Sequence, residues 1–115
     1  MAGYQIVNQN GLHFLTFTIV GWVDVFTRKI YRDIIIESFI YCKEYKGLQL
    51  HAYVTMSHHI HIIASTVEGR NLSELVRDFK RYTSRKIIRT IIEEPGESRP
   101  ISEVRNFREL RLKPN

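Results

Sequence analysis

Cysteine is almost absent from this 115-residue sequence, and its single copy, Cys42, cannot form a disulfide bond within the chain. Long hydrophobic runs are absent too, because no apolar stretch reaches the roughly 18 residues that a membrane-spanning helix needs. The first residues also differ from a secretory signal, since Tyr4 and Gln5 stand where basic and then continuous apolar residues would be expected. These absences predict a cytoplasmic protein that does not enter a membrane. Cys42 lies in a helical pattern beside Phe39 and Tyr41, which is typical of a small buried side chain rather than of a nucleophile.

Acidic residues are too few in the C-terminal part of the chain to balance its basic ones. Residues 1–69 contain five Lys/Arg and five Asp/Glu, whereas residues 70–115 contain twelve Lys/Arg and seven Asp/Glu. All of the net charge of +5 therefore lies in the C-terminal part. Such a concentrated positive field attracts polyanions, of which nucleic acid is the most common. At this length we expect one compact domain, close to the size at which a partner subunit often completes the core.

The first half of the chain predicts a strand, a helix and a second strand. Residues 12–20 are a run of β-branched and aromatic side chains between two glycines, which indicates a strand. Thr27 is placed to cap a helix over residues 28–46, which Gly47 would end. Residues 49–56 alternate in hydropathy and predict the second strand. One face of that strand would carry its apolar side chains, Leu50, Ala52, Val54 and Met56.

The second half adds a third strand and a longer helix. Residues 57–58 form a short break before an apolar segment over residues 60–63, which predicts a strand that returns antiparallel to the second. Asn71 and Glu74 resemble a capping box at the start of a helix over residues 71–94. The buried face of this helix would consist of Leu72, Leu75, Val76, Phe79 and Ile87.

The order strand, helix, strand, strand, helix predicts an α+β fold of the ferredoxin-like or RNA-recognition type, an antiparallel plait with both helices on one face. This plait normally has a fourth strand after the second helix. Residues 97–115 lack a strand-like pattern, because their apolar side chains are spaced as in a short amphipathic helix. We therefore expect a domain over residues 1–96 and a helical tail over residues 97–115, with the fourth strand missing or atypical.

Four of the five histidines fall within eleven residues of one another, although histidine is scarce in proteins. Side chains at i and i+2 of a strand share a face, so His59 and His61 can offer two imidazoles to one divalent cation. His51 and His58 need no such role. The alternative interpretation is that the pair is merely polar and exposed on a sheet face. A histidine-triad nucleotide hydrolase is disfavoured, because Ile63 stands where that class has a third histidine.

A longer stretch around these histidines carries a family resemblance. Residues 53–63, YVTMSHHIHII, resemble the HUH motif of single-tyrosine insertion-sequence transposases and their REP-associated relatives, in which Met-Pro-Asn-His-x-His stands at the start of a strand. A serine and a histidine replace the usual proline and asparagine. Residues 14–18, FLTFT, are similar to the family's first strand, and residues 75–84, LVRDFKRYTS, are similar to its following helix. The resemblance covers about residues 11–99 in one order and with compatible spacing.

This resemblance implies a function in DNA transposition and recombination. In the family, two histidines and a third ligand hold Mg²⁺ or Mn²⁺ against the scissile phosphate of single-stranded DNA, so His59 and His61 would be catalytic metal ligands. A tyrosine attacks as the nucleophile, and the phosphotyrosyl link lets a later strand be joined without ATP. The partner would be a hairpin-forming single strand, which the endonuclease nicks and rejoins.

The family's nucleophile has no counterpart that the motif identifies. Its tyrosine stands on a later helix, shortly before an Asn-Pro pair, and this sequence contains no tyrosine after Tyr82. We therefore expect the nucleophile segment and the third metal ligand to be absent, as in a truncated or degenerate copy. Tyr82 is a candidate replacement, but its position three residues after Phe79 is typical of an aromatic at the rim of an apolar helix face.

The second helix carries two further surface predictions. Its polar side has four basic residues that we predict to contact the DNA backbone, although a solvated helix face is the alternative. These residues are Arg77, Lys80, Arg81 and Arg85. Four isoleucines go round the same helix and leave apolar surface for either a missing segment or a second subunit, and we expect a homodimer. They are Ile87, Ile88, Ile91 and Ile92.

Two other functions stay open from the sequence. A non-catalytic nucleic-acid-binding plait would hold single strands equally well in the presence of a chelator. A metal-dependent phosphodiesterase would use water as the nucleophile and would leave no covalent protein–DNA adduct.

Overall fold

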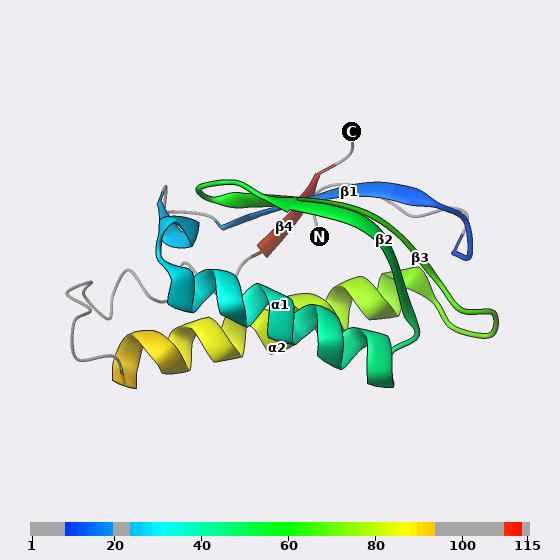
Figure 1. Ribbon diagram of the computed structural model, residues 1–115. Coiled ribbons are helices and arrows are strands. Elements are labelled where there is room, and N and C mark those ends of the chain that lie inside the picture. The colour runs from blue at the N-terminus through cyan, green and yellow to red at the C-terminus, as the bar shows by residue number, and fades with distance from the viewer. Residues whose placement is uncertain (1–8, 20–23, 94–109, 114–115) are drawn as a thin grey trace.

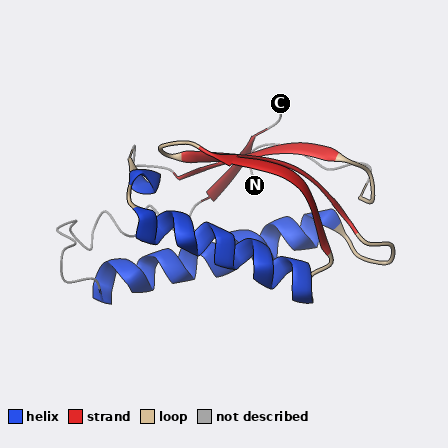
Figure 2. Cartoon of the chain, in the orientation of Figure 1, coloured by secondary structure: helices blue, strands red, loops and turns tan. Residues whose placement is uncertain are grey.

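The computed structural model describes residues 9–19, 24–93 and 110–113. They form a four-stranded antiparallel sheet in the order β2-β3-β1-β4, and both long helices pack against one of its faces (Figure 1, Figure 2). The chain order β1, α1, β2, β3, α2, β4 confirms the predicted ferredoxin-like plait. The elements are β1 His13–Ile19, a short 3-10 helix η1 Val25–Thr27, α1 Lys29–Tyr45, β2 Leu48–Thr55, β3 His59–Thr66, α2 Leu72–Glu93 and β4 Leu110–Lys113.

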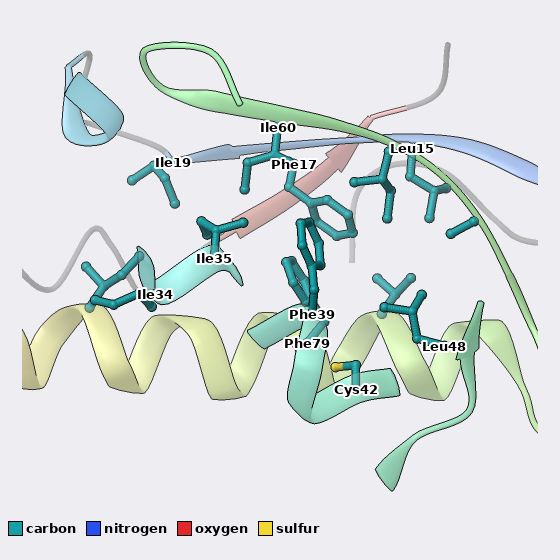
Figure 3. Packing of buried hydrophobic residues seen from close by; sticks show 14 of the residues in the cluster. Leu15, Phe17, Ile19, Ile34, Ile35, Phe39, Cys42, Leu48, Ile60 and Phe79 are labelled. Carbon is teal, nitrogen blue, oxygen red and sulfur yellow. The ribbon is translucent and has the colours of Figure 1, made fainter. Parts of the chain in front are cut away.

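The hydrophobic core fills the space between the sheet and the two helices. Leu15 and Phe17 of β1 and Ile60 of β3 are buried there, on the face of the sheet that the helices cover (Figure 3). The Phe17 ring lies 4.8 Å from the Phe79 ring of α2, and Phe79 stacks on Phe39 of α1 at 5.6 Å between ring centroids. Such aromatic pairs contribute about 0.5–1.5 kcal/mol beyond the area they bury. The three rings therefore connect strand β1 to both helices.

A buried hydrogen-bond chain also joins the helices to each other. The Thr83 hydroxyl of α2 donates to the Ser38 hydroxyl of α1 at 2.8 Å. Ser38 in turn donates to the Ile34 carbonyl one turn earlier, at 2.9 Å. Both hydroxyl side chains are fully buried, so the Thr83 hydroxyl depends on Ser38 for its acceptor.

Strand β2 departs from the predicted alternation. Its register with β3 shifts between Leu50 and Ala52, which places an extra residue, His51, in the strand as a β-bulge. One extra residue moves every later side chain to the other face of the sheet. Leu50 packs against the core, whereas Ala52 and Val54 lie on the side that the helices leave open. The predicted common face for the apolar residues of β2 is therefore wrong.

Two glycines adopt the left-handed backbone conformation that favours glycine. Gly47, with a φ of 77°, ends α1 as predicted, and a Cβ there would lie 2.8 Å from Arg70 Cγ and 2.9 Å from Val67 Cγ2. Gly69, with a φ of 87°, lies in the loop before α2, where a Cβ would meet open space. Position 47 is thus restricted by both φ and space, and position 69 by φ alone.

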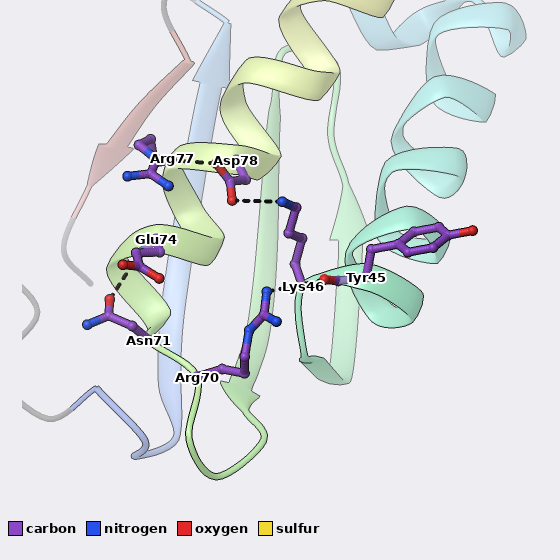
Figure 4. A network of polar contacts seen from close by, with 7 residues as sticks. All are labelled: Tyr45, Lys46, Arg70, Asn71, Glu74, Arg77 and Asp78. Atoms are coloured by element: carbon purple, nitrogen blue, oxygen red, sulfur yellow. Dashed lines mark hydrogen bonds and ion pairs between the residues drawn. The ribbon is translucent and has the colours of Figure 1, made fainter.

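One of the two side-chain caps predicted at helix N-termini is present. The Asn71 side chain accepts a hydrogen bond from the Glu74 backbone N–H at 3.0 Å, which confirms the predicted start of α2 (Figure 4). The predicted Thr27 cap of α1 is wrong. The Thr27 hydroxyl donates back to the Asp24 carbonyl at 2.7 Å, because the chain makes a turn of 3-10 helix there before α1 begins.

The fourth strand, which we expected to be missing or atypical, is present. β4 pairs antiparallel with β1, with Leu110 opposite Ile19 and Lys113 opposite Thr16. The predicted tail helix is therefore wrong over residues 110–113. Four residues are too few for a periodic pattern to identify a strand, and the pairing that stabilises it comes from the other end of the sequence. The expected domain boundary at residue 96 lies outside the described residues.

The apolar residues near the end of α2 are mostly used within the chain. Ile87 and Ile91 are buried, Ile88 packs against the edge of the core, and Ile92 alone of the four isoleucines is largely exposed, at 63%. The apolar surface predicted around this helix is thus smaller than the sequence suggested. No helix among the described residues is long and apolar enough to cross a membrane.

Candidate metal and nucleic-acid site

The predicted histidine pair stands at the start of β3, just after a fixed turn. The Met56 N–H donates to the His59 carbonyl at 2.7 Å and closes the turn between β2 and β3. The Ser57 carbonyl accepts a hydrogen bond of 2.8 Å from η1, and the His58 carbonyl accepts one of 3.0 Å from the end of β1. These bonds hold the backbone from which the histidine side chains project.

The alternation of β3 separates the histidines from the core. Ile60 and Ile62 are buried under the helices, whereas His59 and His61 are half-buried on the opposite, open face of the sheet. The two imidazole centroids are 4.8 Å apart, with ring planes at 79° to each other. His58, to which the sequence assigned no role, places its ring centroid 4.7 Å from that of His59. The structure therefore brings the two predicted residues together, with a third imidazole beside them.

Strand β1 supplies a hydrogen-bond partner that sequence reasoning missed. Thr16 is directly opposite His61 in the β1–β3 register, and its Oγ1 lies 2.9 Å from His61 Nδ1. Only strand pairing brings these two residues together, because they are 45 positions apart. The alternation of Thr16 with the buried Leu15 and Phe17 was the one local signal that could have placed it on the open face. On the same strand, Thr18 is opposite His59.

The donors on this face suit part of a metal site. Two neutral imidazole nitrogens can bind a divalent transition-metal ion, and oxygen ligands, which Mg²⁺ and Mn²⁺ prefer, would have to complete the set. Within residues 9–19, 24–93 and 110–113, no group of three His, Cys, Asp or Glu side chains is arranged so that it could hold a metal ion. The described residues thus offer two ligands, and phosphate or water oxygens could occupy the remaining positions.

Tyr82, the candidate replacement nucleophile, lies in the helical layer. Its ring stacks on Tyr41 of α1 with 4.2 Å between centroids and 8° between planes, and the Lys86 ammonium is 5.7 Å from its centroid. The helices pack against the face of the sheet opposite the histidines (Figure 1). The structure therefore does not bring Tyr82 to His59 or His61.

The four basic residues predicted to contact DNA also lie in the helical layer. Arg81 and Arg85 are exposed and line a groove between α1 and α2. Arg77 is exposed, and its Nε is 3.2 Å from the Asp78 carboxylate. Lys80 does not line the groove and is half-buried, and burial lowers the pKa of its ammonium. The four predicted residues therefore do not form one uniform basic surface, because only Arg81 and Arg85 line the groove.

A polar network fixes the end of α1 against the start of α2 (Figure 4). Asp78 is bound by Lys46 at 3.3 Å as well as by Arg77. Burial acts to raise the pKa of Asp78, but the hydrogen bonds from Arg77 and Lys46 outweigh it, so this pKa is below its usual range. Arg70 donates to the Tyr45 carbonyl at 3.2 Å and ties the loop before α2 to the same place.

Cys42 is fully buried between the helices and the sheet, as the sequence predicted. Burial raises the pKa of its thiol to about 12, because a thiolate would be poorly solvated there. A group that stays protonated at neutral pH is a poor nucleophile. Cys42 is therefore part of the core.

Known structures share this fold. A REP-associated tyrosine transposase bound to a REP hairpin matches with a TM-score of 0.63 and 19% identity, over 76% of this chain and 53% of that one. A candidate transposase from Deinococcus radiodurans R1 matches with a TM-score of 0.60 and 13% identity, over 78% of this chain and 68% of that one. The chain spans about half of the length of the REP-associated protein.

Sequence comparison extends the likeness from fold to family. No curated protein matches the chain in a sequence search. The sequence profile of the IS200-like transposases, however, matches residues 12–97, which include both histidines and both long helices. Because the match covers most of the sequence, the chain belongs to the family of IS200-like transposases.

Proposed function

We propose that this chain binds single-stranded DNA and takes part in cutting and rejoining it, with a divalent metal held by His59 and His61. One observation carries the proposal. In a member of the IS200-like transposase family, these two imidazoles stand 4.8 Å apart on a sheet face that no helix of the described chain covers. A DNA strand lying across that face can reach both rings.

The residues of the open face would have distinct roles. His59 and His61 would bind Mn²⁺ or Mg²⁺, which when bound stabilises negative charge on the scissile phosphoryl group. Thr16 would keep the His61 ring in one orientation by accepting a hydrogen bond from Nδ1–H, so that Nε2 carries the lone pair for the metal. The buried Ile60 between them holds the strand against the helices.

The proposed covalent step transfers the phosphoryl group from DNA to a tyrosine. The tyrosine hydroxyl loses its proton as its oxygen forms a new P–O ester bond. The P–O bond of the strand breaks, and the released strand end keeps its oxygen and takes up a proton to become a hydroxyl group. Rejoining is the same exchange in reverse, with a strand hydroxyl as the attacking group. Because Tyr82 packs on Tyr41 in the other layer, we propose that the attacking tyrosine comes from outside the described residues or from a second molecule.

The proposed partner is a hairpin-forming single strand. The REP-associated transposase with the same fold was solved bound to a REP hairpin. In the present chain all of the net positive charge lies in residues 70–115. We propose that basic residues of α2 contact the phosphate backbone, as phosphate contacts require Lys or Arg on one surface. The residues concerned are Arg77, Lys80, Arg81 and Arg85.

The first experiment is to incubate the protein with Mn²⁺ and a labelled single strand that carries a hairpin, and to look for cleavage and a covalent adduct on a denaturing gel. Both should require Mn²⁺ and be lost in His59→Ala and His61→Ala. His51→Ala is the matched control. His51 is an exposed imidazole on the neighbouring strand, bound to Ser65 at 3.0 Å, and its loss should leave both products unchanged.

The products separate the three candidate functions. A histidine-dependent adduct establishes transposase chemistry, and peptide mapping then identifies the tyrosine. Histidine-dependent cleavage without an adduct indicates a metal-dependent phosphodiesterase that uses water. DNA binding that persists in chelator, with neither cleavage nor adduct, would leave a non-catalytic binding plait and overturn the proposal.

Two further parts of the proposal concern the protein's surroundings. We propose that it acts in the cytoplasm, where DNA is accessible to it, and that it acts as a homodimer. The exposed Ile92 near the end of α2 is the apolar side chain available there to a second copy. The molar mass measured by light scattering, for the protein and for Ile92→Glu, tests the dimer.

A further inference from the structure

A second surface lies in the helical layer, on the side of the sheet away from the histidines. There the facing flanks of α1 and α2 enclose a groove with a volume of about 370 Å³. Its lining is mostly basic and aromatic, and we call it the inter-helix groove. The lining residues are Tyr41, Lys46, Asp78, Arg81, Tyr82, Arg85, Lys86 and Arg89.

The acidic groups near the groove are already occupied. The Asp78 carboxylate is bound by Lys46 and Arg77. Lys86 pairs with Glu37 of α1 at 3.1 Å, and this hydrogen bond raises the pKa of Lys86. Three exposed guanidinium groups form no ion pair within the part of the chain that the structure describes, and they belong to Arg81, Arg85 and Arg89. The groove therefore carries positive charge that these neighbours do not neutralise.

The three arginines are evenly spaced along one flank of α2. Four residues of α-helix rise about 6 Å, so Arg81 and Arg89 are separated by about 12 Å along the helix axis. A duplex strand carries one phosphate per about 3.4 Å of axis, so this distance corresponds to three or four nucleotides. Guanidinium groups bind phosphate oxygens through paired N–H donors. The stacked Tyr41 and Tyr82 rings line the same groove.

We propose that the inter-helix groove binds the phosphate backbone of a DNA segment other than the one held at the histidines. This inference rests on the proposed function only in taking DNA as the ligand. Binding at the groove needs no metal, because guanidinium groups supply the charge. A row of arginines at regular spacing fits a regular row of phosphates better than it fits the irregular carboxylates of an acidic protein. The molecule thereby has two DNA contacts on opposite layers.

The test measures how DNA affinity depends on salt, in EDTA, by fluorescence anisotropy of a labelled hairpin and of a labelled single strand. The double variant Arg85→Gln/Arg89→Gln removes two charges from the groove. The control Lys29→Gln/Lys43→Gln removes two charges from exposed positions of α1 that do not line it. Thermal melting by circular dichroism should show that both variants stay folded, since all four side chains are exposed.

The expected result is specific to the groove. The slope of log K against log salt is negative, and each lost phosphate contact reduces its magnitude by about 0.7 for a single strand and 0.9 for a duplex. The magnitude of the slope should therefore be smaller by about 1.4–1.8 for the arginine variant. Between 50 and 200 mM salt, the unmodified protein should then lose roughly 7- to 12-fold more affinity than the variant. The lysine variant should keep the original slope.

The other outcomes are equally informative. Equal slope changes in the two double variants would mean a diffuse charge effect and would overturn the proposal, as would the absence of DNA binding in EDTA. Displacement of DNA by inorganic pyrophosphate at matched phosphate concentration, or by polyglutamate at matched charge, would also overturn it in favour of another anion. The variant His59→Ala/His61→Ala should bind in EDTA like the unmodified protein. If arginine-dependent binding is seen without Mn²⁺-dependent cleavage, the proposed metal chemistry is refuted and the proposed DNA binding at the groove is supported.

Discussion

Replacing Thr16 by valine removes one hydroxyl group, keeps the branched side chain, and thereby probes a single contact of the candidate site. Thr16 is 6% exposed, and its Oγ1 lies 2.9 Å from His61 Nδ1. When Nδ1 carries the proton, Nε2 has the lone pair that a metal needs. Without the hydroxyl, nothing on β1 selects that tautomer, and the ring gains rotational freedom.

The size of the effect follows from the role of such contacts. Loss of the hydrogen-bond partner of a metal-binding histidine costs about 10- to 100-fold in metal affinity, which corresponds to about 1.4–2.8 kcal/mol. We therefore expect the Kd for Mn²⁺ to rise by that factor in Thr16→Val. Thr18→Val is the control, because Thr18 is opposite His59 on the same strand and has no hydrogen bond to His61. It should change the Kd little.

Two measurements are needed to separate orientation from general damage. Calorimetric titration with Mn²⁺ gives the affinity, and two-bond ¹⁵N–¹H spectra of the metal-free protein give the tautomer of His61. The unmodified protein should show a proton on Nδ1, and Thr16→Val should show a mixture. If the variant binds Mn²⁺ normally and keeps a single tautomer, the hydrogen bond does not position His61 and the reasoning is refuted.

Three stability predictions follow from contacts elsewhere in the chain. Gly47→Ala should destabilise the fold by about 2 kcal/mol or more in urea unfolding, because backbone strain adds to the clash of the new Cβ with Arg70 and Val67. Gly69→Ala should cost only the backbone strain, about 1–2 kcal/mol. Equal losses of stability in the two variants would contradict the clash. Ser38→Ala leaves the Thr83 hydroxyl buried without its acceptor and should cost about 1–3 kcal/mol, part of which the added Thr83→Val should restore. Strictly additive effects would argue against that bond. The lowered pKa of Asp78 means that its carboxylate contributes stability above its unfolded pKa of about 4, and that this contribution is lost as the pH falls through the lower folded pKa. Asp78→Asn should therefore weaken the dependence of unfolding free energy on pH below about 4, and an unchanged profile would exclude a role for this ion pair.

Local sequence signals were sufficient for most of the architecture. Hydrophobic periodicity identified both long helices and three strands. The helices, β1 and β3 each bury one continuous face, and β2 has an alternating sequence although its bulge divides that face. Gly47 and Asn71 marked helix ends correctly, since a positive φ and a side-chain cap are local requirements. The two histidines could be paired from their spacing because residues i and i+2 of any strand share a face.

What the sequence could not provide depends on pairing between distant segments. The bulge at His51 adds one residue to an otherwise regular alternation, so the face of each later residue of β2 depends on its partner in β3. The contact of Thr16 with His61 depends on the register between β1 and β3. The separation of Tyr82 from the histidines depends on which layer each element joins, which no spacing within the sequence encodes.

The pairing of β4 with β1 has a consequence for synthesis on the ribosome. Strand β1 ends at Ile19 and its neighbour β4 begins at Leu110, so 91 residues must be added before the two can pair. At about 5–20 residues per second this takes about 5–18 s. During that time one side of β1 has unpaired N–H and C=O groups, a template on which another extended chain can dock. Strand β1, which carries the Thr16 partner of His61, therefore keeps one edge open to wrong strand partners while the rest of the chain is made.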